Sequence, residues 1–259
     1  MRDFAQRHPL LFALSILAAL VGLTLVARTL LPSAPIGDVS GLSPEALKPP
    51  SPLQQAITAI KNADNLFWVL ALALAALLLT ALGWWREAGF RAPRWRKLYL
   101  LVFPLAVCAF ALSDGFLLPD KGPLVAGLLV VFIAAIGEEA VFRGLLWRVF
   151  VPRGPVWAVV VTSLLTGALY LARSTNDALP EAIRLSAVAA CGGFTYGALR
   201  WRTASIWPVV GVHAALAYVP TVAALGSTKY PILVWISTLG FVLYGLLLLR
   251  NRRVRADGR

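Results

Sequence analysis

The chain has 259 residues, of which 59% are hydrophobic and only 14% are charged. A soluble core cannot bury that much apolar surface in a chain of this length, so the composition excludes an ordinary soluble protein and predicts an integral membrane protein. The formal net charge of +12 does not indicate a nucleic acid partner, because basic residues also collect in the cytoplasmic connections of membrane proteins.

Apolar runs long enough to cross a bilayer as helices follow one another along the chain. They cover residues 9–31, 67–85, 98–118, 123–147, 156–173, 182–199, 206–226 and 231–249. We therefore expect an all-α integral membrane fold, a bundle of about eight transmembrane helices in which residues 1–259 form a single membrane domain. The first run is long for a signal peptide and lacks a clear cleavage site, which favours a retained anchor.

Residues 32–66 form the one long connection between these runs. Their Pro, Ser and Gly content and mixed charges predict an exposed extracytoplasmic loop. Within it, a capping box that begins at Ser51 is followed by the apolar residues Ile57 and Ile60. This pattern predicts a short amphipathic helix on the membrane surface.

Basic residues alternate between the two sides of the predicted bundle. With the N-terminus inside, the cytoplasmic segments hold 16 of the 24 Lys and Arg residues, whereas the outside loops hold five. The cytoplasmic ones lie in residues 1–8, 86–97, 148–153, 200–202 and 250–259. This asymmetry predicts a multi-pass protein of the cell membrane with both termini cytoplasmic.

Run 123–147 carries an unusual charged cluster made of Glu138, Glu139 and Arg143. An ionised group at bilayer depth costs about 2.5–3.5 kcal/mol on insertion scales, so three of them in one helix require an explanation. Glu139 and Arg143 stand four residues apart, the favourable order for an ion pair on one helix face. Glu138 lies about 100° around the helix and has no local partner, so we expect it to face a cavity, a distant donor or water.

His213 is one of two histidines in the chain and lies inside a predicted span, whereas His8 directly precedes the first span. At about 1.5 Å per residue, Glu138 lies roughly 13–15 Å from the cytoplasmic end and His213 roughly 10–12 Å, so the two could share one site. A hydrogen-bonded packing role is the common alternative for a lone histidine. The two cysteines, Cys108 and Cys191, lie inside apolar runs and are interpreted as packing residues.

These residues resemble the motifs of the CAAX-processing and bacteriocin-processing intramembrane proteases. Glu138, Glu139 and Arg143 match the first motif of that family, two glutamates and then an arginine four residues after the second. The stretch from Phe194 to His213 resembles the later pattern, a Gly-containing helix, a basic turn and a second helix with a histidine. The resemblance implies a protease core at residues 123–226.

Two of the family's motifs are only partly matched by this chain. The second motif has a histidine where this chain has Tyr170, and the Phe that precedes it by four residues is replaced by Thr166. The third motif places Asn or Asp four residues after its histidine, where this chain has Ala217. One of two expected histidines and an amide partner are therefore missing.

The resemblance implies an endopeptidase that cleaves near the cytoplasmic interface, with Glu138 as general base and His213 as oxyanion donor. Glu139 and Arg143 complete the candidate site, and Tyr170 is expected to position water or substrate. No cofactor is expected, and zinc is disfavoured because catalytic zinc normally takes three protein ligands.

The expected partners are the lipid bilayer and a protein or peptide substrate in or at the membrane, with no nucleic acid. Two other functions stay open from the sequence. The first is a degenerate family member that binds a membrane peptide without cutting it. The second is an ion-coupled transporter, since buried carboxylates are also typical there, although no internal repeat supports it.

Overall fold

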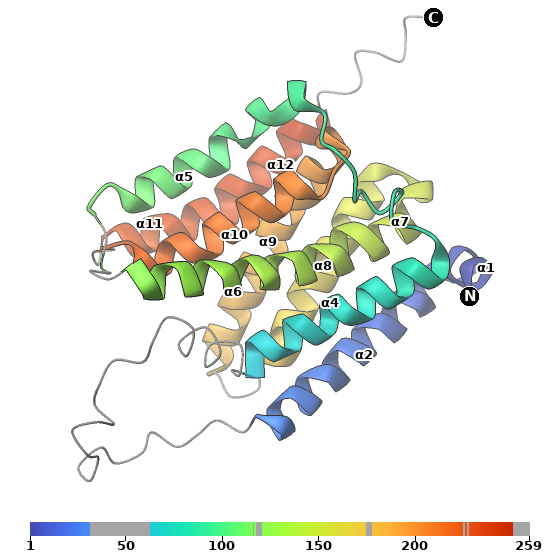
Figure 1. The fold of residues 1–259 in the computed structure, drawn as a ribbon. Helices are drawn as coiled ribbons and strands as arrows, with labels where there is room; N and C mark the ends of the chain where they lie inside the picture. Colours follow the sequence, from blue (N-terminus) through green and yellow to red (C-terminus); the bar gives the residue numbers. More distant parts are fainter. Residues whose placement is uncertain are drawn as a thin grey trace, which may run out of the picture.

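The computed structural model describes residues 1–31, 63–115, 117, 121–174, 178–224, 226 and 228–250. Its regular elements in these ranges are helices (Figure 1). They are α1 (Arg2–Arg7), α2 (Pro9–Leu30), α4 (Ala63–Leu82), η2 (Trp95–Leu101), α5 (Val102–Leu112), α6 (Lys121–Glu139), η3 (Ala140–Leu146), α7 (Trp147–Phe150), η4 (Val151–Arg153), α8 (Pro155–Arg173), α9 (Leu179–Thr203), α10 (Trp207–Val222), α11 (Lys229–Trp235), η5 (Ile236–Gly240) and α12 (Phe241–Arg250). The helix predicted near Ser51 lies outside the described residues.

Six stretches of the described chain are long and apolar enough to cross a membrane, which confirms the all-helical membrane fold. They are Pro9–Leu30, Asn65–Leu82, Trp95–Leu112, Pro155–Arg173, Leu179–Thr203 and Lys229–Arg250. The two other predicted spans are also helical. Residues 121–150 run through α6, η3 and α7 and carry the charged cluster, and α10 has only 16 residues. A count of eight spans therefore stays a prediction.

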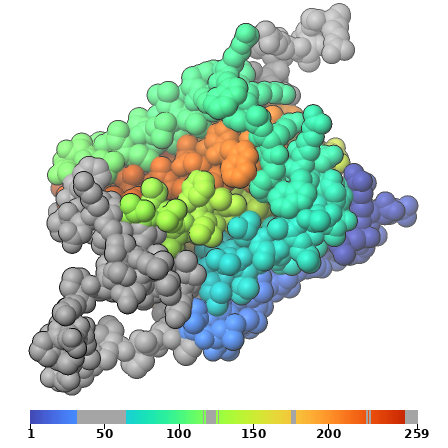
Figure 2. Space-filling view, in the orientation of Figure 1, coloured from blue at the N-terminus to red at the C-terminus, as the bar shows by residue number. Residues whose placement is uncertain are grey.

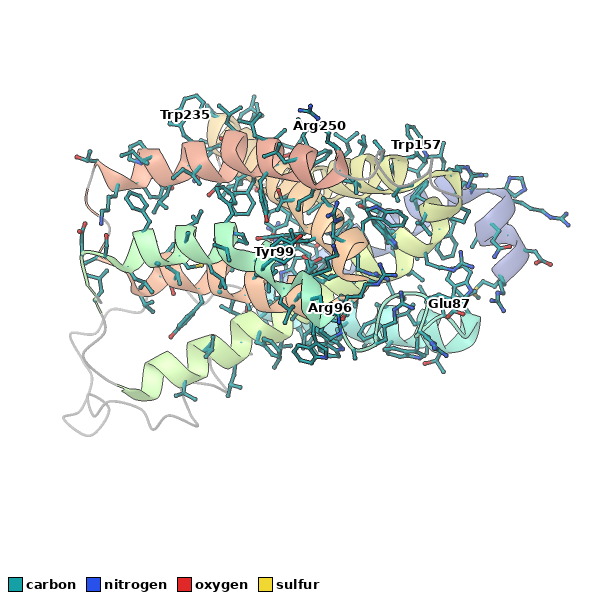
Figure 3. The ribbon with its side chains drawn as sticks, turned by 90° about the horizontal axis from the view of Figure 1, so that it is seen from above. Glu87, Arg96, Tyr99, Trp157, Trp235 and Arg250 are labelled. Carbon is teal, nitrogen blue, oxygen red and sulfur yellow. The ribbon has the colours of Figure 1, made fainter. Side chains whose placement is uncertain are left out.

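The outer surface of the bundle is apolar. In the most apolar 18-residue window of each span, 22–39% of the residues are buried, and large apolar side chains such as Leu14, Leu77 and Leu164 are more than half exposed, as expected for contact with lipid. Trp157 and Trp235 project from this surface toward opposite ends of the bundle (Figure 3). Tryptophan at both ends is typical of residues that lie at the two membrane interfaces.

The basic connections gather at one end of the bundle. Arg91 donates from its side chain to the carbonyl of Ala204, and Arg200 donates to the carbonyl of Glu87. The opposite end is held by an ion pair between Lys229 and Asp114, 2.7 Å apart. This sorting of charge agrees with the predicted placement of basic segments on one side, while the orientation in a membrane stays a prediction.

Helix α6 packs between α4 and α10, and its N-terminal half reaches the face of the molecule seen in Figure 2, while its C-terminal end is buried (Figures 1 and 2). It can approach α4 closely because residue 137 is glycine: a Cβ atom there would lie 2.6 Å from the carbonyl oxygen of Trp68. On α9, Gly197 packs closely against Val159 of α8, where a Cβ atom would lie 3.2 Å from a methyl group of Val159. These contacts fix the position of the C-terminal end of α6, where both glutamates lie.

Candidate active site

The two glutamates are the last residues of α6, directly before the π-helical segment Ala140–Leu146. Such π segments are rare and occur frequently at functional sites. Glu139 is fully buried and Glu138 is 4% exposed, so neither carboxylate is solvated from the surface. Each must find its partners inside the protein.

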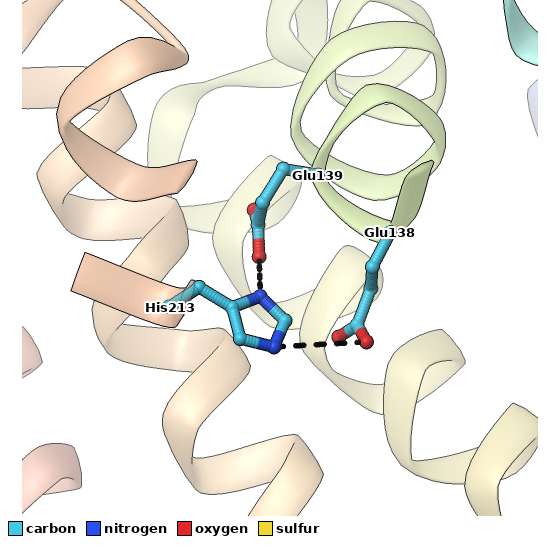
Figure 4. A group of neighbouring side chains, drawn as sticks. All are labelled: Glu138, Glu139 and His213. Carbon is cyan, nitrogen blue, oxygen red and sulfur yellow. Dashed lines mark hydrogen bonds and ion pairs between the residues drawn. The ribbon is translucent and has the colours of Figure 1, made fainter. Parts of the chain in front are cut away.

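His213 of α10 lies between the two carboxylates (Figure 4). Its Nδ1 atom is 2.8 Å from Oε1 of Glu139, and its Nε2 atom is 3.9 Å from Oε2 of Glu138. The structure thus brings the glutamates and the histidine together, as their similar depths in the sequence predict.

Glu138 also has the distant donor that the sequence requires. The hydroxyl of Tyr170, on α8, donates a hydrogen bond of 2.9 Å to Oε2 of Glu138. Tyr170 stands at the position of the second-motif histidine, so the substituted residue still points into the cluster. Thr166 does not contribute, because its buried hydroxyl donates to the carbonyl of Thr162 on its own helix.

Arg143 is fully buried beside the two carboxylates and does not line the cavity. Its Nε atom is 3.4 Å from Oε2 of Glu139, which confirms the predicted ion pair, and its guanidinium also lies 3.9 Å from Oε1 of Glu138. None of the guanidinium nitrogens forms a hydrogen bond with the described residues. A Cβ atom at Gly193 would lie 2.3 Å from the guanidinium, so this glycine provides the space that Arg143 occupies.

A cavity of about 220 Å³ opens beside the cluster. Glu138, Tyr170 and His213 line its polar side. Most of the remaining wall is apolar and comes from α5, α9, α10, α11 and α12: Val107, Cys108, Ala111, Leu185, Val188, Ala189, Leu216, Val219, Pro220, Leu233 and Phe241. Ala217, which stands at the third-motif Asn position, also lines the cavity. Tyr170 and Ala217, which replace the family's histidine and amide, therefore line the same cavity.

Tyr196 of α9 is a site residue that the sequence did not reveal. Its ring stacks on the imidazole of His213 with centroids 5.0 Å apart, and the guanidinium carbon of Arg143 lies 5.7 Å from the same ring. Tyr196 is buried and lines the cavity. A tyrosine in an apolar helix has no motif of its own, so only its distance from His213 in space identifies it.

Donor atoms of Glu138, Glu139 and His213 lie within 4.8 Å of one another, close enough for these three residues to hold a metal ion. The imidazole turns Nδ1 to Glu139 and Nε2 to Glu138. An ion bound at Nε2 would have Glu138 as its carboxylate ligand, with Glu139 holding the far side of the ring.

The fold and the site together define a helical membrane protein with a buried acid and histidine cluster that opens to a cavity. Residues 120–219 match the family of Rce1-like proteins, described as type II CAAX prenyl endopeptidase Rce1-like. This match confirms the resemblance predicted from the sequence, and the matched segment contains all five predicted site residues. No curated protein and no solved structure matches the chain. At the level of the family, the match supports an enzyme of the protease type.

Proposed function

We propose that this protein is an intramembrane endopeptidase of the cell membrane that hydrolyses a protein or peptide substrate near the cytoplasmic interface, with a water activated by Glu138. One observation carries the proposal: a buried carboxylate lines a cavity with Nε2 of His213 only 3.9 Å away. Glu139 and Arg143 already form an ion pair, so charge pairing alone does not require a second acid here.

The charges of the cluster suit such a reaction. Nδ1 of His213 faces the carboxylate of Glu139, and a carboxylate only accepts, so this nitrogen carries a proton. A second proton on Nε2 makes the ring a cation, and two carboxylates then face two cations in a buried space. That balance limits the cost of burying the four groups.

In the proposed reaction, the carboxylate of Glu138 takes a proton from a water at the cavity wall. The water oxygen bonds to the scissile carbonyl carbon, and the electron pair of the C=O bond moves to its oxygen. The Nε2–H group of His213 donates to that oxyanion. The electron pair on the oxyanion then re-forms the C=O bond as the C–N bond breaks, and Glu138 gives its proton to the leaving nitrogen. The water therefore supplies one oxygen of the new carboxyl group and one hydrogen of the new amine.

The proposal also assigns a role to Tyr170 and a reaction that does not depend on zinc. The phenol of Tyr170 holds the orientation of the Glu138 carboxylate through its hydrogen bond, and it acts as a positioning residue rather than as a base. Because Glu139 faces Nδ1 of His213 and leaves Glu138 and Nε2 of His213 as the donors for an ion in the cavity, the reaction is proposed to need no zinc, which normally takes three protein ligands. A chelator that removes tightly bound zinc should leave the cleavage rate unchanged.

A second candidate function is peptide binding without cleavage. Its support is that Tyr170 and Ala217 line the cavity at positions where the family has a histidine and an amide. The third function considered, an ion-coupled transporter, has less support because the matched family consists of proteases.

The test offers the reconstituted protein a farnesylated peptide that ends in a CAAX sequence, as the family description suggests, together with the same peptide without the lipid. We expect the wild type to release the C-terminal fragment of at least one of them. Removal of a general base costs roughly 10²–10⁴ in rate, so Glu138→Gln should lose that much, and His213→Ala should also lose most activity.

Two results separate the candidate functions. Cleavage at the wild-type rate by Glu138→Gln would exclude the protease proposal at this site. If the wild type retains the peptide without cutting it, and Glu138→Gln no longer retains it, the binding function replaces the enzymatic one.

A further inference from the structure

A second pocket lies at the basic end of the bundle. It has a volume of about 590 Å³ and is formed where α1 meets α2 and where η4 meets α8. Arg7, His8 and Arg153 supply its polar lining, and the remaining lining residues are Pro9, Leu10, Leu11, Phe150 and Trp157. None of these residues takes part in the site around Glu138.

The charge of this pocket is not neutralised by the protein. Arg7 and Arg153 are exposed, and neither forms an ion pair with a carboxylate among the described residues. Asp3, one turn earlier on α1, does not pair with Arg7. Two guanidinium groups that face one pocket present the planar donors that bind phosphate oxygens well.

The other side of the pocket is apolar and belongs to the lipid-facing surface. Leu10 and Leu11 begin α2 and are 57% and 55% exposed, and Trp157 begins α8 and is 46% exposed. Figure 3 shows Trp157 projecting outward on the part of the bundle near α1. An occupant must therefore combine an anionic head with an apolar chain.

We propose that this pocket binds the headgroup of an anionic phospholipid. The phosphate lies between Arg7 and Arg153, and the first part of an acyl chain runs along Leu10, Leu11 and Trp157. Basic pockets between transmembrane helices on the cytoplasmic side are suited to anionic lipid headgroups, and each basic residue there adds attraction to the lipid. The site is independent of the proposed hydrolysis.

The test measures lipid retention by native mass spectrometry of the full chain in mixed micelles of phosphatidylglycerol and phosphatidylcholine. We expect the wild type to retain phosphatidylglycerol selectively. The double variant Arg7→Gln/Arg153→Gln should lose roughly tenfold or more of that retention. The matched control Arg94→Gln/Arg96→Gln changes the same net charge at the same end of the bundle, outside the pocket, and should keep it.

Other outcomes would overturn the proposal. Equal losses in both double variants would mean attraction to the whole basic surface, and displacement of the lipid by millimolar inorganic phosphate would mean an ion site without a lipid chain. Retention of an acidic peptide in preference to the lipid would assign the pocket to a protein partner. Thermal unfolding in phosphatidylcholine micelles checks that each variant folds. If the double variant does not fold, lipid retention is compared between the single variants Arg153→Gln, in the pocket, and Arg96→Gln, outside it.

Discussion

Arg143 is the residue that ties the two carboxylates together. Its guanidinium is fully buried, lies within 3.9 Å of both glutamates and occupies space that Gly193 leaves free. A buried cation without carboxylates nearby would be strongly destabilising, and so would two buried carboxylates without a cation. The cluster therefore depends on the size of residue 193 as well as on its charged members.

The variant Gly193→Ala tests this dependence. The added methyl group would lie 2.3 Å from the guanidinium, so Arg143 must move away from the glutamates. We expect a loss of at least roughly tenfold in cleavage rate, because the orientation of Glu138 changes with its ion pair. Gly22→Ala is the control, since a Cβ atom there meets nothing within 4 Å. Equal rates for the two variants would contradict the account.

Tyr170→Phe tests the hydrogen bond to Glu138 with the ring kept in place. A hydrogen bond to a charged group contributes about 1.5–3 kcal/mol, which corresponds to roughly a ten- to hundredfold effect. We expect kcat to fall by that factor and KM to change little, because the ring still fills the cavity wall. Steady-state kinetics on a cleaved peptide measure both values. A change confined to KM would instead assign Tyr170 to substrate binding.

The sequence predicts much of this cluster and its Glu139–Arg143 ion pair, but not the other contacts within it. Glu138, Glu139 and His213 could be grouped because polar residues at similar depth in apolar helices are costly and rare. The sequence could not show that His213 bonds to Glu139 at 2.8 Å rather than to Glu138, because the rotation of α10 relative to α6 depends on packing. Tyr196 was missed for the same reason.

Helix α6 and its π-helical continuation η3 form the centre of the site. The apolar pattern of run 123–147 predicts a helix there, and the structure has one. The pattern does not predict the π segment. All seven residues of this stretch are buried, so no alternation of buried and exposed positions in the sequence indicates how many residues make up one turn. Predicted ends were also approximate: run 98–118 extends past α5, which stops at a turn that includes Ser113 and Gly115.

Gly137→Ala tests the close approach of α6 and α4. A methyl group at this position would lie 2.6 Å from the backbone oxygen of Trp68, and backbone cannot rotate away as a side chain can. Overpacking of this kind costs typically about 1–3 kcal/mol, so thermal unfolding in micelles should occur at a lower temperature. Gly211→Ala, with nothing within 4 Å, should keep or raise the unfolding temperature, because alanine favours a helix more than glycine does. An unchanged value for Gly137→Ala would argue against this packing.

At the scale of the whole molecule, the bundle separates its charged connections into two ends. Arg91, Arg200 and Arg202 bind backbone carbonyls at one end, whereas Asp114 and Lys229 pair at the other. The alternation of basic residues along the sequence predicts this separation, because antiparallel neighbours return every second connection to the same side. The sequence does not reveal that the connection between α1 and α2 lies beside η4 and forms a pocket with it.

The predicted orientation of the chain, with both termini in the cytoplasm, can be tested in intact cells. In a chain whose two native cysteines are replaced, Gly226→Cys should react with an impermeant maleimide added from outside. Arg96→Cys should react only after the membrane is opened. Both positions are exposed, so access depends on the side of the membrane alone. The reverse pattern would invert the proposed side of cleavage.

Peptide cleavage in ¹⁸O-labelled water tests the role of Glu138 most directly. The wild type should place ¹⁸O in the new carboxyl group, and so should Glu181→Gln, whose carboxylate pairs with Arg184 away from the cavity. Glu138→Gln should form labelled product more slowly by a factor of roughly 10²–10⁴. Labelled product from Glu138→Gln at the rate of the wild type would contradict the assignment of this buried carboxylate as the base that activates water.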